Sequence, residues 1–426
     1  MNKLISTIVL LLICYLCIAQ NSEKFISNCF KAKYKKAHCF LTDQVQGLIK
    51  PKDIEAPFLQ LESMYGKIEK YSFNCREMAS YGLVEYYTIT YEKSELDIKL
   101  VLNEKNKIGG FFIVPVQNCG INQETYTPPN SNESSTARIF IPTSSSNDSF
   151  SLLLSTPKND SFSKILLLIP GSGPTDENSS IGKTKIFLDL SIELAKQGIA
   201  TIRYSKFQNF NIRPTEVTFK DEYLNDISNI NSYLNRNFSS KQRYILGHSL
   251  GGFATSHFLD SFAGGIFMAC NSSPMDSLMV VQTKYILNLD GELNNAEKQH
   301  LQTMELDYVL LHDSISTLRD SQIILGAPVS YWKSLNNVNI DSLIANSFNV
   351  PKLFLTGDRD YQVPLSDFNK FKSLVEGHKD TKFVMFSGLN HVLIRGNGVP
   401  GPSDYEIPGN ISSQVVNEIV NFLNAH

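Results

Sequence analysis

Short apolar runs alternate with helical patterns along the larger, C-terminal part of this chain, and this alternation limits the folds open to it. Lys164 to Ile169 (KILLLI) is a continuous apolar run, as expected of a strand buried on both faces. Ile186 to Gln197 follows with helical periodicity, and Ile199 to Tyr204 is the next expected strand. Strands that alternate with helices predict an α/β fold, with a mostly parallel sheet flanked by helices and right-handed crossovers.

The same alternation of strand and helix patterns continues to the C-terminus. The further expected strands are Arg138 to Ile141, Phe150 to Ser155, Arg243 to Leu246, Ile266 to Cys270, Lys352 to Thr356 and Lys382 to Phe386. The further expected helices are Glu222 to Asn235, a small-residue helix from Leu250, and Val415 to Leu423. The first two strands of the domain are expected to form an antiparallel pair that opens the sheet.

One interval, between Cys270 and Lys352, shows no strand pattern. It is expected to hold helices instead, over Ser277 to Leu289, Asn295 to Leu311 and Thr317 to Leu325. A helical insertion at residues 274–348 is therefore predicted, either as a lid or substrate-pocket wall or as a passive decoration of the fold.

A length of 426 residues predicts more than one domain. Residues 121–136 are rich in Pro, Asn and Ser and are expected to be a linker, with an α/β domain over 137–426. Residues 20–120 begin with helical patterns and continue with three strand-like runs, which predict a small α+β domain. These runs are Leu83 to Tyr91, Leu96 to Asn103 and Ile108 to Val116.

The first 19 residues have the pattern of an export signal. Lys3 supplies the positive charge, Leu4 to Ile18 is apolar, and Ala19 precedes a cleavage point before Gln20. The apolar run is short for a membrane span, which takes about 20 residues. A secreted or periplasmic protein is expected, with an uncleaved N-terminal anchor as the alternative and no membrane span in the mature chain.

Export permits disulfides, and four cysteines of the mature chain precede residue 120: Cys29, Cys39, Cys75 and Cys119. One or two bridges among them are expected, but their pairing is open. Cys270 ends an apolar run and is expected to be a buried free thiol. No Cys/His cluster has metal-site spacing, so no metal is expected.

The chain offers no signature of a nucleic-acid or nucleotide partner. Its formal net charge is −3, which gives no general attraction to nucleic acid. The turn Gly171-Ser172-Gly173 lacks the third glycine of a dinucleotide site and the lysine of a phosphate-binding loop. No cofactor is therefore expected, and the oligomeric state is open.

Ser249 is the candidate nucleophile, in the sequence Gly247-His248-Ser249-Leu250-Gly251 between an expected strand and an expected helix. A serine at such a sharp turn exposes its hydroxyl above the sheet, and small residues two positions away on each side make room for the turn. The following helix N-terminus places N–H groups beside a developing negative charge.

A serine hydroxyl needs a base, itself held by a carboxylate. Asp358 and Asp360 follow one late strand, and His391 follows the last strand. The order Ser249, Asp360, His391 is that of the α/β-hydrolase class. Asp360 is the preferred acid, with Asp358 as the alternative.

The turn after Lys164 to Ile169 is expected to complete the oxyanion hole. Its small residues let backbone N–H groups approach a reacting carbonyl. Ser172 N–H is the expected donor, with Gly173 as the alternative, and Leu250 N–H is the expected second donor.

Several segments of this chain resemble bacterial carboxylesterases of the EstD type, which are α/β hydrolases related to the dienelactone-hydrolase and prolyl-oligopeptidase-like groups. These segments are Ile169 to Asp176, Gln197 to Tyr204, Gly247 to Gly252, Gly357 to Pro364, Gly388 to His391 and Pro402 to Gly409. The N-terminal strands resemble a small domain of unknown function of the DUF3887 kind. One departure is Ser205-Lys206-Phe207-Gln208, where the family tends to show Asp-Lys-Arg-Gly.

The resemblance implies hydrolysis of short acyl esters of small molecules by Ser249, Asp360 and His391. The motifs do not fix the leaving group, so a peptidase, acyltransferase or thioesterase of the same fold remains an alternative. An inactive, hydrolase-like binding protein is the non-enzymatic alternative, although such proteins commonly lose a member of the triad.

Overall fold

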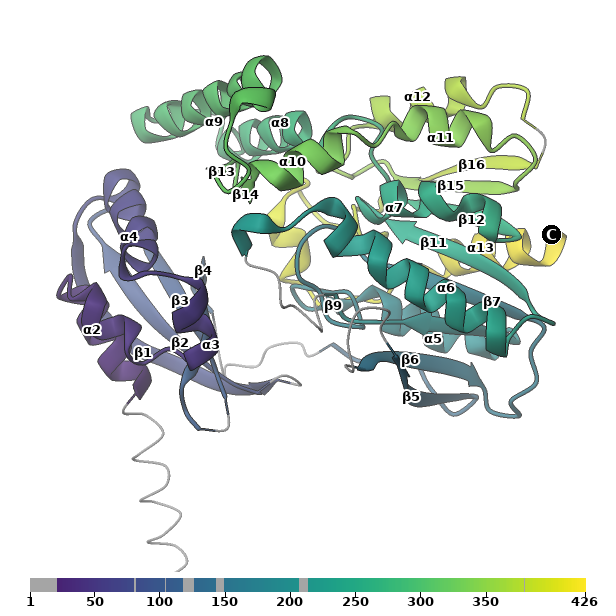
Figure 1. Cartoon of the computed structure of the whole chain (residues 1–426), viewed down its shortest axis with the longest axis horizontal. Coiled ribbons are helices and arrows are strands. Elements are labelled where there is room, and N and C mark those ends of the chain that lie inside the picture. Colours follow the sequence, from purple (N-terminus) through teal and green to yellow (C-terminus); the bar gives the residue numbers. More distant parts are fainter. Residues whose placement is uncertain are drawn as a thin grey trace, which may run out of the picture. The chain divides into compact units, whose positions relative to one another are not determined.

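The computed structural model of the chain describes residues 21–79, 82–103, 105–117, 126–142, 149–206, 214–378 and 380–426. These residues group into two compact units, one up to Gln123 and one from Glu124 onward. Figure 1 shows the elements of each unit. The expected export signal and Cys119 lie outside the described residues.

The N-terminal unit is a four-stranded antiparallel sheet with helices on one face. Residues 21–30 are helical, and the elements that follow are α2 (Tyr34–His38), α3 (Asp43–Leu48), α4 (Pro51–Tyr65), β1 (Ile68–Ala79), β2 (Gly82–Tyr91), β3 (Glu95–Leu102) and β4 (Ile108–Pro115). The strands pair in chain order. Phe25, Ile54 and Phe58 from the helices share one core with Ile98 and Leu100 of β3. The expected α+β class is confirmed, and β1 is a strand that the sequence patterns did not predict.

The larger unit is built on an eight-stranded sheet. Its strands are β5 (Ser134–Pro142), β6 (Ser149–Pro157), β7 (Lys164–Ile169), β10 (Ile199–Arg203), β11 (Gln242–His248), β12 (Gly264–Met268), β15 (Lys352–Gly357) and β16 (Thr381–Phe386). They lie in the order β5-β6-β10-β7-β11-β12-β15-β16. β6 is antiparallel to both of its neighbours, and the pairs from β10 to β16 are all parallel. The mostly parallel sheet with an antiparallel opening pair is confirmed.

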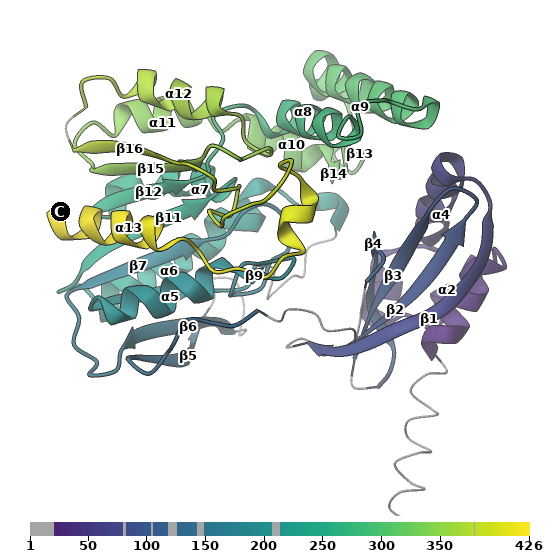
Figure 2. The same ribbon diagram turned by 180° about the vertical axis from the view of Figure 1, so that it is seen from behind.

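Helices cover both faces of this sheet. One face carries α5 (Ile186–Lys196) and α13 (Ser413–Ala425), and the other carries α6 (Asn225–Asn237), α7 (Gly251–Phe258), α11 (Ile340–Asn346) and α12 (Leu365–Leu374). Figure 2 shows the side with α5 and α13. β7 is central, and its residues from Ile165 to Ile169 are all fully buried, as its apolar sequence predicts. Two short strands, β8 (Ser180–Ile181) and β9 (Thr184–Lys185), form a hairpin before α5.

The interval between β12 and β15 contains α8 (Met275–Leu287), α9 (Asn295–Ser314) and α10 (Val329–Asn336), with α8 and α9 packed side by side (Figure 1). The expected helix from Thr317 to Leu325 is wrong. A hairpin of β13 (Ile323–Ile324) and β14 (Ala327–Pro328) stands there instead. Its turn residues Leu325 and Gly326 both have positive φ, at 46° and 75°, which is the geometry of a two-residue hairpin turn.

Candidate active site

Ser249 lies in a sharp turn between β11 and α7. Its φ of 53° falls in the left-handed region, which residues other than glycine seldom adopt. The Ser249 N–H donates to the carbonyl oxygen of Met268 at 2.9 Å, at the end of neighbouring β12. This strand–turn–helix arrangement is the geometry of a nucleophile elbow, in which the serine hydroxyl stands above the sheet edge.

Two glycines make this turn possible. A Cβ on Gly247 would lie 2.4 Å from the carbonyl oxygen of Gly251. A Cβ on Gly251 would lie 2.6 Å from the carbonyl oxygens of Ile169 and Pro170. Both contacts are with backbone, which cannot move aside, so no larger residue fits at either position without changing the turn.

His391 and Asp360 form a buried, hydrogen-bonded pair. His391 Nδ1 lies 2.8 Å from Asp360 Oδ2, and the two side chains are 3% and 1% exposed. Asp360 Oδ1 accepts the N–H groups of Gln362 (2.8 Å) and Val363 (2.9 Å). The carboxylate is therefore fixed by its own loop while its second oxygen orients the imidazole.

Asp358, the alternative acid, is directed elsewhere. It is exposed, and its carboxylate accepts the N–H of Gly388 at 2.7 Å and the hydroxyl of Ser387 at 2.9 Å. Of the two candidates, Asp360 is the one that bonds to His391.

His248 holds the His391 loop beside the nucleophile turn. Its Nε2 lies 3.1 Å from the carbonyl oxygen of His391, and the two rings are 4.9 Å apart. Burial, together with the nearby His391 ring, lowers the pKa of His248 to about 3. The imidazole is therefore neutral, and Nε2–H donates to this carbonyl. One hydrogen bond thus connects the residue before Ser249 to the residue that pairs with Asp360.

The turn after β7 borders Ser249. A Cβ on Gly171 would lie 3.4 Å from Ser249 Cβ, so this turn approaches the nucleophile closely. The Gly173 N–H donates to Glu222 Oε1 at 2.8 Å and is therefore already engaged. Ser172 N–H stays the predicted donor from this turn. Leu250 stands at the start of α7, where N–H groups have no partner within the helix.

A buried polar cluster lies behind this turn. Lys206 Nζ donates to the carbonyl oxygen of Gly171 and lies 2.6 Å from Glu222 Oε1, with the two side chains 0% and 3% exposed. Lys206 Nζ is also 3.1 Å from the hydroxyl of Tyr223. The hydroxyl of Tyr331, in α10, donates to Glu222 Oε2 at 2.5 Å.

The sequence analysis did not identify Lys206, Glu222 or Tyr331 as site residues. One signal was present: Lys206 follows the expected strand Ile199 to Tyr204 closely, at the edge of the sheet where the candidate site lies. A lone lysine after a strand is more often a solvated residue, so the signal alone is weak.

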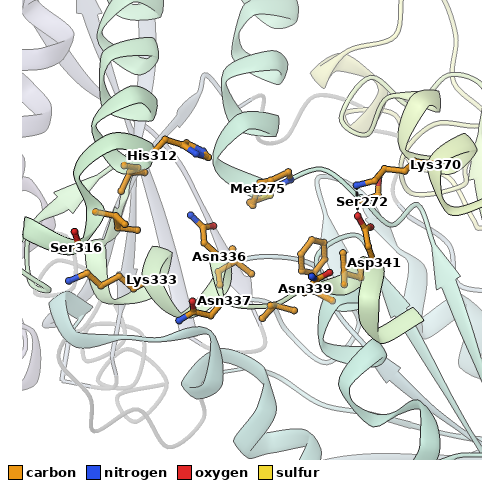
Figure 3. A pocket seen from close by; sticks show the side chains of 17 residues that line it. Ser272, Met275, His312, Ser316, Lys333, Asn336, Asn337, Asn339, Asp341 and Lys370 are labelled. Carbon is orange, nitrogen blue, oxygen red and sulfur yellow. Dashed lines mark ion pairs between the residues drawn. The ribbon is translucent and has the colours of Figure 1, made fainter. Parts of the chain in front are cut away.

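A cavity of about 740 Å³ lies between the helical insertion and the sheet domain (Figure 3). Met275, His312 and Asn336 come from α8, α9 and α10, and Lys370 comes from α12. Phe253 of α7, one turn after Ser249, also lines it. Its lysines are paired, because Lys370 bonds Asp341 at 2.7 Å and Lys333 bonds Asp320 at 2.8 Å.

In the part of the chain that the structure describes, no group of three His, Cys, Asp or Glu side chains converges as a metal site. None of the described helices is both long enough and apolar enough to cross a membrane.

The amino-acid sequence is similar to a known protein family and to a known esterase. Residues 22–111 match the family described as "Protein of unknown function (DUF3887)". The chain is 27% identical over 374 residues to Esterase EstD of Thermotoga maritima. The aligned region covers 85% of this chain and 86% of that protein. These matches confirm the resemblance to EstD-type esterases and the DUF3887-like N-terminal domain that the sequence motifs predicted.

Similar solved structures include the esterase domain of a Rhodothermus marinus protein, which is 13% identical to this chain and has a TM-score of 0.41. The match covers 68% of this chain and 98% of that chain. An esterase of Pyrococcus furiosus is 14% identical to this chain, with a TM-score of 0.43. The match covers 71% of this chain and 98% of the esterase chain. The strand order of the sheet carries the fold assignment: the larger unit has the α/β-hydrolase fold.

Proposed function

We propose that this relative of the EstD-type esterases hydrolyses carboxylic esters of small molecules through an acyl-enzyme on Ser249. The observation that carries the proposal is the buried Asp360–His391 pair, held next to the strand-to-helix turn of Ser249. The similarity to Esterase EstD supports ester chemistry over the other reactions of this fold.

In the first half-reaction His391 Nε2 takes the proton of Ser249 Oγ while Oγ attacks the ester carbonyl carbon. The carbonyl electron pair moves to its oxygen, which accepts hydrogen bonds from the N–H groups of Ser172 and Leu250. Asp360 holds His391 Nδ1–H and stabilises the imidazolium. The bond to the alcohol oxygen then breaks, and the alcohol leaves with the proton from His391.

Water completes the cycle. His391 Nε2 removes a proton from a water molecule, whose oxygen attacks the acyl carbon of the Ser249 ester. The second tetrahedral intermediate collapses, the carboxylic acid leaves, and the proton returns from His391 to Ser249 Oγ. No cofactor enters either half-reaction.

The proposed preference is for short acyl chains, on the strength of the resemblance to EstD-type esterases. We also propose that the helical insertion shapes the acyl pocket. The support for this role is the cavity of about 740 Å³ that the insertion shares with Phe253 of the nucleophile helix (Figure 3).

We further propose that the protein is exported. One support is the export-signal pattern of residues 1–19. A second is the disulfide that Cys75 forms. Three other cysteines are free: Cys29, Cys39 and Cys270. Disulfides persist in oxidising compartments. N-terminal sequencing of the protein from its native cells tests the proposal: we expect a chain that begins at Gln20, and a cytoplasmic chain that begins at Met1 contradicts it.

The ester-hydrolysis proposal is tested with p-nitrophenyl acetate. Replacing Ser249→Ala is expected to lower kcat by about a millionfold, the scale seen when such a nucleophile is removed. Ser256→Ala is the matched control, because this serine lies in α7, the helix that follows Ser249, and its hydroxyl donates to the carbonyl of Phe253 at 2.7 Å. Full activity in Ser249→Ala, or faster cleavage of the matching p-nitroanilide than of the ester, contradicts the proposal.

A further inference from the structure

The Lys206–Glu222 pair lies behind the loop that carries the expected oxyanion donor, and it contacts that loop at two backbone atoms. Lys206 Nζ binds the carbonyl oxygen of Gly171, and Glu222 Oε1 binds the N–H of Gly173 at 2.8 Å. We propose that Lys206 and Glu222 are positioning residues that aim the Ser172 N–H at the oxyanion. This inference rests on the proposed function.

The first step of the argument is the geometry of one peptide unit. The structure has no cis peptide bond among its described residues, so the bond between Gly171 and Ser172 is trans. In a trans peptide the C=O and the following N–H point in opposite directions. Because Lys206 holds the Gly171 oxygen on the buried side, the Ser172 N–H points to the opposite, exposed side.

The loop lies directly beside Ser249. Gly171 is so close to the nucleophile that a Cβ on it would be 3.4 Å from Ser249 Cβ. Ser172 is exposed, whereas Lys206 and Glu222 are buried. Among the described residues the N–H of Ser172 donates to no other group, so it can meet a substrate oxygen on the side of the loop away from the ion pair.

Glu222 anchors the next peptide unit and thereby limits rotation about Ser172. Gly173 has a φ of 75°, a left-handed conformation that a glycine adopts without strain. With Gly171 O and Gly173 N both bonded, the residue between them is held from each side. A donor fixed before the reaction needs no reorganisation when the negative charge develops, which is why preoriented donors lower the barrier.

Glu222 is itself held at both oxygens. Oε1 contacts Lys206 and Gly173, and Oε2 accepts the Tyr331 hydroxyl at 2.5 Å. Burial and the adjacent carboxylate raise the pKa of Tyr331 well above its usual value, so its hydroxyl stays a proton donor. Since Tyr331 belongs to α10, the carboxylate joins the oxyanion loop to the helical insertion.

A purely structural role predicts a different outcome from a positioning role. A buried ion pair that only fills space can be replaced by neutral side chains of similar volume with little loss of stability. The paired substitution Lys206→Met/Glu222→Gln removes both charges of this ion pair together. It also removes the only buried cation that the structure places on Gly171 O, among the described residues.

The experiment measures kcat and KM for p-nitrophenyl acetate and the inhibition constant of an alkylboronic acid, whose adduct with Ser249 resembles the tetrahedral intermediate. For Lys206→Met/Glu222→Gln we expect kcat to fall about 100-fold, as when one oxyanion donor is lost, with KM nearly unchanged. The boronic acid is expected to bind more weakly by the same factor. Tyr331→Phe, which removes a single hydroxyl, is expected to lower kcat severalfold with KM unchanged.

Lys352→Met is the matched control. Lys352 is also a fully buried lysine, and its Nζ donates to the carbonyl oxygen of Val350 at 2.8 Å, away from the loop after β7. This variant is expected to lower the melting temperature without changing kcat or boronic acid binding of the folded protein.

Two outcomes overturn the inference: a folded Lys206→Met/Glu222→Gln variant with the wild-type kcat and boronic acid affinity, or a Tyr331→Phe variant with an unchanged kcat when the double variant does not fold. In both cases loss of activity in Ser249→Ala leaves the proposed function intact. If the wild-type protein and Ser249→Ala hydrolyse the ester equally, the proposed function fails, and this inference fails with it.

Discussion

At the scale of single residues, Asp358 and Asp360 stand two positions apart in one loop and have different surroundings. Asp360 is buried against His391, whereas Asp358 is exposed and bonds Gly388. Asp360→Asn is expected to lower kcat for p-nitrophenyl acetate by about 10⁴-fold, because an amide stabilises the wrong imidazole tautomer and gives no charge to the imidazolium. Asp358→Asn is the matched control, and equal losses in the two variants contradict the assignment.

His248 gives a second prediction, on stability. Its pKa is about 3 in the folded protein, mainly because of burial, and about 6.5 when unfolded. The unfolded chain therefore binds the proton first as the pH falls. The stability from this group is complete above about pH 6.5 and is lost progressively towards pH 3.

Urea unfolding at pH 7 and pH 5 measures this loss. Between these values the free energy of unfolding of the wild-type protein is expected to fall by about 2 kcal/mol more than that of His248→Asn. Equal falls in the two proteins contradict the assignment of a buried, neutral imidazole to His248.

The sequence predicted Ser249, Asp360 and His391 as the triad because each lies shortly after a strand of a recognisable sheet. Lys206 also follows a strand, but a lone lysine there is a weak signal, and Glu222 follows no strand. Their partners lie 35 and 49 positions away in the chain, at Gly171 and Gly173, so only the folded chain brings these groups together. A single amino-acid sequence rarely shows whether a lysine is buried or lies at the surface.

At the scale of elements, the cavity beside α8 gives a test of the helical insertion. Met275→Trp adds a large ring where Met275 lines the cavity. If the cavity receives the acyl chain, kcat/KM for p-nitrophenyl octanoate is expected to fall about tenfold relative to the acetate, since each buried methylene contributes about 0.8 kcal/mol.

Val281→Trp is the control for this substitution. Val281 lies in the same helix and is 53% exposed, so the added ring reaches solvent. An unchanged ratio of octanoate to acetate activity in Met275→Trp contradicts a role of the cavity in binding the acyl chain.

Most elements of the sheet domain were predictable because buried parallel strands are apolar throughout, as β7 is. Two of the differences between the predictions and the structure have local causes. β1 includes Glu69, Lys70, Arg76 and Glu77 and lies at the edge of its sheet, so its apolar pattern is interrupted. The predicted helix from Thr317 to Leu325 ended at a turn whose left-handed residues, Leu325 and Gly326, the periodicity did not reveal.

At the scale of the whole molecule, each of the two units has its own hydrophobic core. A chain that begins at Glu124 keeps Thr127, whose carbonyl oxygen accepts a hydrogen bond from Asn410 at 3.0 Å. We expect this shorter chain to fold and to retain kcat for p-nitrophenyl acetate within about threefold, since domains with separate cores fold alone. Its loss of folding, or of most of its activity in the folded state, contradicts this expectation.

The central claim is that Ser249 is a nucleophile activated by His391. The most direct measurement is labelling of the full chain with a fluorophosphonate, followed by mass spectrometry of its peptides. We predict one label per chain, on Ser249, with labelling abolished in Ser249→Ala and strongly slowed in His391→Ala, because the serine hydroxyl depends on the adjacent base. No label on Ser249 in the folded wild-type protein, or the same rate in His391→Ala, contradicts the claim.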